Sequence, residues 1–186
     1  MLSLTQLVIP IVVSAVLVFV ASSLIHMVFK WHNRDYRGLP NEDAVRTVLR
    51  AGNVTPGTYV VPYCADMKDM KKPEMVEKFK QGPNAFITVM KSGEPSMGKP
   101  LGLWFALNLA ISIVAGYLAA HTVIPDASFL AICRVVGIVG FLAYAGGSVS
   151  SGIWMGKPPG SVAREVLDAF IYGLVMALAF GWLWPR

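Results

Sequence analysis

Residues 129–147 read FLAICRVVGIVGFLAYAGG, and this stretch decides the fold. It is almost wholly apolar, and a helix of this length spans the ~30 Å hydrocarbon core of a bilayer at ~1.5 Å per residue. Buried helices of a soluble protein would be shorter and would carry a polar face. Four such runs predict four membrane-spanning helices: residues 7–29, 101–120, 129–149 and 166–184.

The composition of the 186-residue chain also indicates a membrane protein. Hydrophobic residues make up 55% of it and charged residues 15%, whereas soluble domains carry about 25% charged residues. The net charge is +5, but no helix-turn-helix, RNP or zinc-finger pattern accompanies it. We therefore expect the lipid bilayer as the main partner and no nucleic acid.

Basic residues are concentrated in the long link between the first two runs. Between Lys30 and Lys99 there are twelve Lys or Arg and eight Asp or Glu residues, whereas the link 121–127 has no Lys or Arg. Because basic loops stay in the cytoplasm, residues 30–100 are predicted to be cytoplasmic and both termini to lie outside. The predicted parts are helix 1 (1–29), the insert (30–100) and helices 2–4 (101–186).

The insert itself has the pattern of a small α/β module. Asn41 is a suitable N-cap for a helix that ends near Ala51, and Pro73 is a suitable first residue for a second helix that ends near residue 82. Residues 58–63 and 84–91 are predicted strands. The predicted fold class is an all-α bundle of four transmembrane helices with a cytoplasmic α/β insert.

Small residues recur at helical spacing in three of the spans. Such stripes let helices approach closely, and they favour self-association or binding of a protein partner in the membrane. The predicted packing positions are Ser112, Gly116 and Ala120 in the second span, Gly137 and Gly140 in the third, and Ala169, Gly173, Ala177 and Gly181 in the fourth.

Polar residues inside the spans are the candidate functional positions. Arg134 lies about 9 Å below the outer mouth of its helix at ~1.5 Å per residue, so its side chain either reaches the interface or serves an ion or substrate. Asn108 can hydrogen-bond across the bundle.

Asp168 and Glu165 are predicted at a helix N-terminus, where the dipole stabilises carboxylates; a proton relay is the alternative. Asp168 is predicted at a different depth from Arg134, so we expect no direct pair.

The histidines are too scattered along the chain to predict a metal site. His26 is a candidate haem ligand within a span, but His32 is predicted on the inner surface and His121 on the outer one. No cofactor is therefore predicted.

The segment that contains Cys64, Met67 and Met70 offers soft ligands for Cu(I), although packing is the simpler role for its methionines. Cys133 falls inside a span, so no disulfide with Cys64 is expected.

Catalytic motifs are absent from the sequence: it has no nucleophile elbow, HExxH, P-loop or dinucleotide fingerprint. We therefore expect no enzyme, and the leading prediction is a membrane scaffold or accessory subunit. The alternatives are a small transporter or channel subunit that uses Arg134 and Asn108, and a redox protein with haem or copper.

Several short motifs resemble those of a family of small bacterial four-span membrane proteins without an assigned activity. They are WHNRDYRGLPNEDAV (31–45), PYCAD (62–66), PSMG (95–98), WMGKPP (154–159) and FGWLWP (180–185). The resemblance implies a bacterial inner membrane, which would place both termini in the periplasm. It implies no functional residues.

Overall fold

The computed structural model describes residues 2–124 and 126–185 and confirms the predicted bundle of four long apolar helices with an α/β insert between the first two. Four helices are long and apolar enough to cross a membrane, so the chain is a multi-pass membrane protein. They are α1 (Val8–Ser23) with its π-helical extension η1 (Leu24–Phe29), α4 (Gly98–Thr122), α5 (Phe129–Met155) and α6 (Pro159–Leu183).

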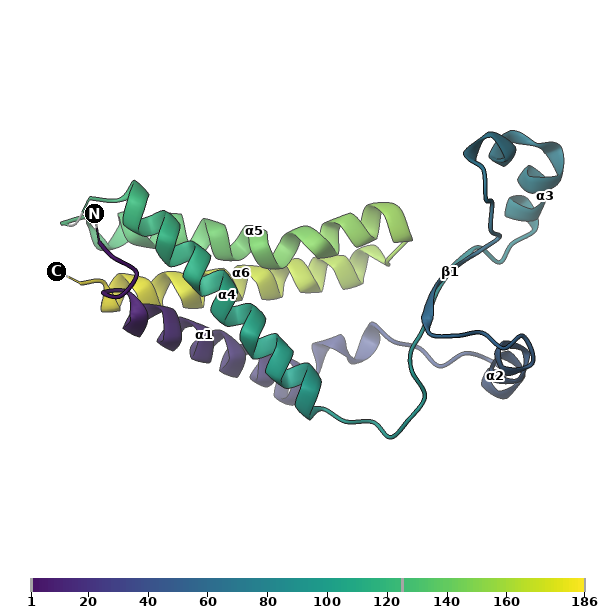
Figure 1. Ribbon diagram of the computed structural model, residues 1–186, viewed down its shortest axis with the longest axis horizontal. Helices are drawn as coiled ribbons and strands as arrows, with labels where there is room; N and C mark the ends of the chain where they lie inside the picture. The colour runs from purple at the N-terminus through teal and green to yellow at the C-terminus, as the bar shows by residue number, and fades with distance from the viewer. Residues whose placement is uncertain (1, 125, 186) are drawn as a thin grey trace. The chain divides into compact units, whose positions relative to one another are not determined.

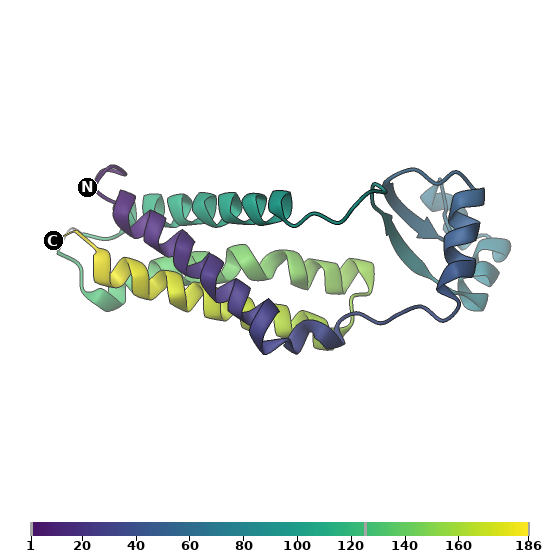
Figure 2. The same cartoon turned by 90° about the horizontal axis from the view of Figure 1, so that it is seen from below.

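Helices α5 and α6 make the most extensive contact of the bundle and run side by side (Figures 1 and 2). Small residues permit this approach. A Cβ atom at Gly173 would lie 2.8 Å from the carbonyl oxygen of Gly137, and one at Gly140 would lie 3.2 Å from the Cα atom of Gly173. Much of the small-residue stripe of α6 is therefore occupied by α5 of the same chain.

Helix α1 packs against both α4 and α6. Ser112 of α4 is fully buried and donates a hydrogen bond to Ser14 of α1 at 3.3 Å. A Cβ atom at Gly116 would lie 3.2 Å from the side chains of Ile11 and Phe180. The stripe of small and polar residues on α4 thus faces the interior of the bundle.

The start of α6 differs from the predicted start of the fourth span. The helix begins at Pro159 rather than at residue 166, because proline is favourable at the first position of a helix. Asp168 is consequently the tenth residue of α6, whereas the helix dipole acts within the first turn. The prediction that Asp168 sits at a helix N-terminus is wrong.

Residues Gly38–Pro95 form a separate compact unit. The strands β1 (Gly57–Val61) and β2 (Ala85–Val89) pair antiparallel, with Tyr59 opposite Ile87. The unit also contains α2 (Glu42–Ala51), the 3-10 helix η3 (Met67–Lys71) and α3 (Pro73–Gln81). The predicted order of helix, strand, helix and strand is confirmed.

Candidate functional site

The chain bends where the first membrane helix ends. The α-helix widens into the π-helix η1, a form frequently found at functional sites. Lys30 follows in the left-handed conformation, at φ 53° and ψ 21°, which is uncommon for a residue with a side chain. The 3-10 helix η2 (Trp31–Arg34) then begins. This corner turns His32 back toward His26.

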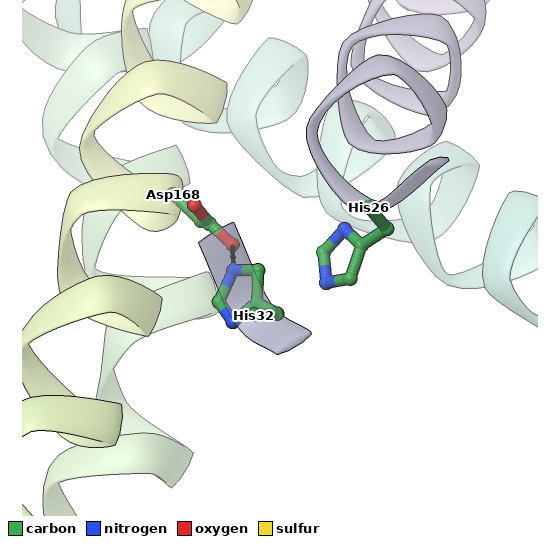
Figure 3. Close-up of side chains that lie close together, drawn as sticks. All are labelled: His26, His32 and Asp168. Carbon is green, nitrogen blue, oxygen red and sulfur yellow. Dashed lines mark hydrogen bonds and ion pairs between the residues drawn. The ribbon is translucent and has the colours of Figure 1, made fainter. Parts of the chain in front are cut away.

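The two histidine rings are stacked, with centroids 4.6 Å apart and an interplanar angle of 3°. Asp168 of α6 completes the group, because its Oδ2 atom lies 2.7 Å from Nε2 of His32 (Figure 3). One ligand atom from each of the three side chains lies within 4.8 Å of the others. His32 and Asp168 are buried, whereas His26 is exposed. We call these three residues the His–His–Asp cluster.

His32 lies between two carboxylates. Its Nδ1 atom is 2.6 Å from Oδ2 of Asp35, and its Nε2 atom is 2.7 Å from Oδ2 of Asp168. A neutral imidazole has a single N–H group and can donate only one of these bonds. Both bonds form together when the ring is a positively charged imidazolium. Two other arrangements satisfy the geometry with the Nδ1 hydrogen still donated to Asp35: a protonated carboxyl of Asp168 that donates to Nε2, or a cation at Nε2.

Asp35 is anchored by the beginning of α6. Its Oδ1 atom accepts hydrogen bonds from Ser161 Oγ at 2.8 Å and from Arg164 Nε at 2.9 Å. The bond from Arg164 holds the pKa of Asp35 well below its usual range; bonds from Ser161 and His32 act in the same direction, and burial opposes them. Asp35 is therefore an ionised acceptor fixed in position beside His32.

His26 is oriented by its own helix. Its Nδ1 atom lies 2.9 Å from the carbonyl oxygen of Ser22, which can only accept, so Nδ1 carries the hydrogen. In the neutral ring, Nε2 then has a free lone pair. The side chain of Ser22 accepts a hydrogen bond from Nε1 of Trp104 at 2.8 Å, which ties this turn to α4.

The His–His–Asp cluster has the donor set of a catalytic zinc site. Two imidazole nitrogens and one carboxylate oxygen bind zinc and leave a fourth position open; the same set suits non-haem Fe(II). Zinc ligands stand ~3.3 Å apart at bond lengths of ~2.0–2.1 Å, so His32 and Asp168 would separate by about half an ångström. The His26 ring, now parallel to that of His32, would have to turn and approach so that its lone pair points at the same ion. Each histidine also donates a hydrogen bond from its Nδ1–H group to an oxygen, as metal-binding histidines do with their second nitrogen.

The expectation that the histidines are too scattered to define a site is wrong for His26 and His32. On a continuous α-helix, six positions correspond to a rotation of ~240° and a rise of ~9 Å, which would separate the rings. The left-handed corner at Lys30 removes that separation. His121 does lie apart, exposed and donating to Tyr117 within α4.

Sequence reasoning missed the contributions of Asp35, Ser161 and Arg164 altogether. The pair His32 and Asp35, three residues apart, is the signal that could have pointed to a supported histidine.

A cavity of about 520 Å³ adjoins the cluster and is lined by residues of α1, η1, α4, α5 and α6. His26 and Asp168 lie in its wall together with three aromatic residues, Trp104, Tyr144 and Tyr172. Burial leaves two of these wall groups without a hydrogen-bond partner among the described residues, namely Oδ1 of Asp168 and the hydroxyl of Tyr172. Both atoms are covered by neighbouring protein atoms, so they are not open to the cavity.

The other polar candidates lie outside the His–His–Asp cluster. Asn108 is fully buried, and its Oδ1 accepts a hydrogen bond from the hydroxyl of Tyr144 at 2.8 Å. Arg134 is exposed and makes no side-chain hydrogen bond or ion pair with any residue in the described ranges. Cys64 and Cys133 are both free thiols, and Met67 is 76% exposed.

Comparisons of the chain with models of protein families, with curated proteins and with solved structures found no match. The resemblance to the bacterial four-span family stays a prediction.

Proposed function

We propose that the protein is a membrane metalloprotein that binds one divalent transition-metal ion, with zinc the best match, through His26, His32 and Asp168. The observation that supports the proposal is the convergence of three ligand atoms within 4.8 Å. The hydrogen bonds of the histidines with Asp35 and with the carbonyl oxygen of Ser22 support the proposal further, because they engage the second nitrogen of each ring. A scaffold would not require this arrangement.

The donor set favours a reactive metal over a structural one. Structural zinc sites are closed by four protein ligands, whereas catalytic sites have three and keep a fourth position for water or substrate. Zinc in such a site lowers the pKa of its water to about 7 and polarises carbonyl groups. The residues of the chain would orient the metal, and the adjoining cavity would admit a substrate to the fourth position.

We further propose a bacterial inner membrane, with the insert in the cytoplasm and both termini in the periplasm. The cluster would then lie at the cytoplasmic end of the bundle. Lys30, Arg34 and Arg37 lie just beyond the first span, and Lys157 precedes α6 at the same end. Basic residues at this end match the positive-inside rule and the anionic surface of the inner leaflet.

Metal analysis of the full-length protein tests the proposal. The protein would be purified in detergent through a tag without histidines, incubated with zinc, desalted and measured by inductively coupled plasma mass spectrometry. We expect about one zinc per chain in the natural protein and less than a tenth of that in His32→Ala and Asp168→Asn. His121→Ala is the matched control, since this histidine is exposed and outside the cluster; it should bind like the natural protein.

Cobalt provides an independent readout of the same site. A protein-bound Co(II) ion with nitrogen and oxygen ligands should give visible absorbance bands that His26→Ala weakens and His121→Ala leaves unchanged. Equal zinc content in all variants, or no zinc retained by folded natural protein, would overturn the metal proposal. In that case the scaffold prediction becomes the better account of the bundle.

A further inference from the structure

The cavity beside the cluster extends along the membrane helices from the end of the bundle where α4 begins. Its wall follows α4 from Met97 to Leu107, about 15 Å at ~1.5 Å per residue. Met27 of η1 and Ala143 of α5 also belong to the wall. The volume of about 520 Å³ is within the range of pockets that hold small ligands. The cavity is therefore long enough for part of a hydrocarbon chain.

Apolar side chains of the wall are open to the surface of the bundle. Met27, Leu101 and Leu107 are 72%, 41% and 48% exposed, and they lie on helices that are long and apolar enough to cross a membrane. The hydrocarbon core of a bilayer contains no water that could fill an apolar hollow in such a surface. The occupant of this part of the cavity is therefore a hydrocarbon chain from the surrounding lipid.

Two lysines belong to the chain segments that form the end of the cavity where α4 begins. Lys99 stands between the wall residues Met97 and Leu101, and Lys30 follows the wall residue Met27 by three positions. Both lysines are exposed, and neither side chain forms an ion pair or hydrogen bond with a residue in the ranges 2–124 and 126–185. Lysines near the membrane surface attract anionic lipid headgroups.

The acidic residues of the wall already have partners within the bundle. Glu165 is paired with Lys157, and Asp168 is hydrogen-bonded to His32. Neither carboxylate is therefore needed as a partner for the two lysines at the end of the cavity. Those lysines keep their positive charge available for a headgroup, and the apolar part of the wall remains available for its hydrocarbon.

We propose that this cavity holds one acyl chain of an anionic phospholipid, whose phosphate is bound by Lys30 and Lys99. The lipid comes from the leaflet at the end of the bundle where α4 begins. One molecule accounts for both features, because its hydrocarbon fills the apolar part of the cavity and its phosphate neutralises the two unpaired lysines. The inference goes beyond the metal proposal and does not require an ion in the cluster.

Titration of the full-length protein in detergent with palmitoyl-oleoyl phosphatidylglycerol, followed by native mass spectrometry, tests the proposal. We expect saturable binding of one lipid per chain, and weaker binding of palmitoyl-oleoyl phosphatidylcholine, whose headgroup has no net charge. The double variant Lys30→Gln, Lys99→Gln should weaken binding of the anionic lipid roughly tenfold. Ala143→Phe enlarges an exposed residue of the wall. It should also weaken binding roughly tenfold, the loss expected when about two methylene groups can no longer be buried.

Matched controls place the same substitutions outside the cavity. The double variant Lys80→Gln, Lys91→Gln removes two exposed lysines of the insert, and Ala110→Phe enlarges an exposed alanine of α4 that is not part of the wall. Both controls should bind phosphatidylglycerol like the natural protein. The thermal midpoint of each variant, measured in the same detergent, shows whether it is folded; all the substituted residues are exposed, so we expect no change.

Equal binding of phosphatidylglycerol and phosphatidylcholine would overturn the proposal, as would equal binding of phosphatidylglycerol by all variants. A loss confined to Ala143→Phe, or confined to the variant of Lys30 and Lys99, would also overturn it, since the proposed site requires both the cavity and the lysines. The zinc content of Ala143→Phe should equal that of the natural protein. Loss of lipid binding with full zinc content, or the reverse, therefore separates failure of one proposal from failure of the other.

Discussion

The Nε2 atom of His32 lies 2.7 Å from Oδ2 of Asp168, although 136 positions separate the two residues in the chain. This bond joins the corner after the first membrane helix to the third turn of α6. The contacts of Asp35 with Ser161 and Arg164 join the same corner to the first two turns of α6. The geometry of the His–His–Asp cluster therefore depends on how α1 and α6 pack together.

Replacing Asp35 by asparagine should weaken metal binding without removing a ligand. Asparagine can still accept from Nδ1 of His32, but the negative charge that orients and polarises the ring is lost. Substitutions of such supporting residues lower metal affinity by about 10-fold to 100-fold. Zinc affinity would be measured by competition with a chromogenic chelator. Asp126→Asn, an exposed loop carboxylate, is the control. An unchanged affinity in Asp35→Asn would show that Asp35 does not position His32.

The stabilising effect of Asp35 should disappear in acid. Its pKa is depressed in the folded protein, mainly by the bond from Arg164, so its contribution to stability is fully present above the unfolded pKa of ~3.9. That contribution is lost as the pH falls from there through the lower folded pKa. With EDTA present, the thermal midpoint of the natural protein should exceed that of Asp35→Asn at pH 5, and the difference should shrink below about pH 4. A difference that stays constant down to pH 2.5 would contradict the prediction.

Substituting Gly173 should disturb the contact between α5 and α6. An added Cβ atom would meet the carbonyl oxygen of Gly137 at 2.8 Å and the backbone nitrogen of Phe141 at 3.1 Å, and backbone atoms cannot rotate away. We expect Gly173→Ala to destabilise the protein by about 1–3 kcal/mol, the usual range for overpacking. Unfolding in mixed micelles would measure this. Gly146→Ala, also on a membrane helix but with open space around it, should leave stability unchanged or raise it. Equal stability of the two variants would argue against the observed packing.

The proposed orientation predicts which cysteines an impermeant reagent can reach. With Cys133 replaced by alanine, Cys64 in the insert should react with a membrane-impermeant maleimide only after the cells are lysed. Ser3→Cys in a Cys64→Ser background should react in intact cells, because residue 3 is exposed and precedes α1. The reverse pattern would invert the orientation and place the cluster at the periplasmic end.

The predicted fold agrees with the observed fold because the sequence signals for its helices and turns are local. A run of apolar residues such as 129–149 predicts a membrane helix without knowledge of its neighbours, since lipid requires every backbone group to bond within its own segment. The turn residues of the insert work in the same way, and Pro73 does begin α3. The start of α6 was predicted wrongly because the two prolines and the glycine at this place can either end a loop or begin a helix.

The sequence by itself determined the four spans and the α/β insert, because hydropathy and turn-forming residues act over short stretches of chain. Only the tertiary structure decided the candidate site. The rings of His26 and His32 meet because a π-helical turn and a left-handed Lys30 bend the chain, and Asp168 reaches them only because α6 packs beside α1. Such a site depends on the relative position of distant segments, and the composition of each segment does not specify that position.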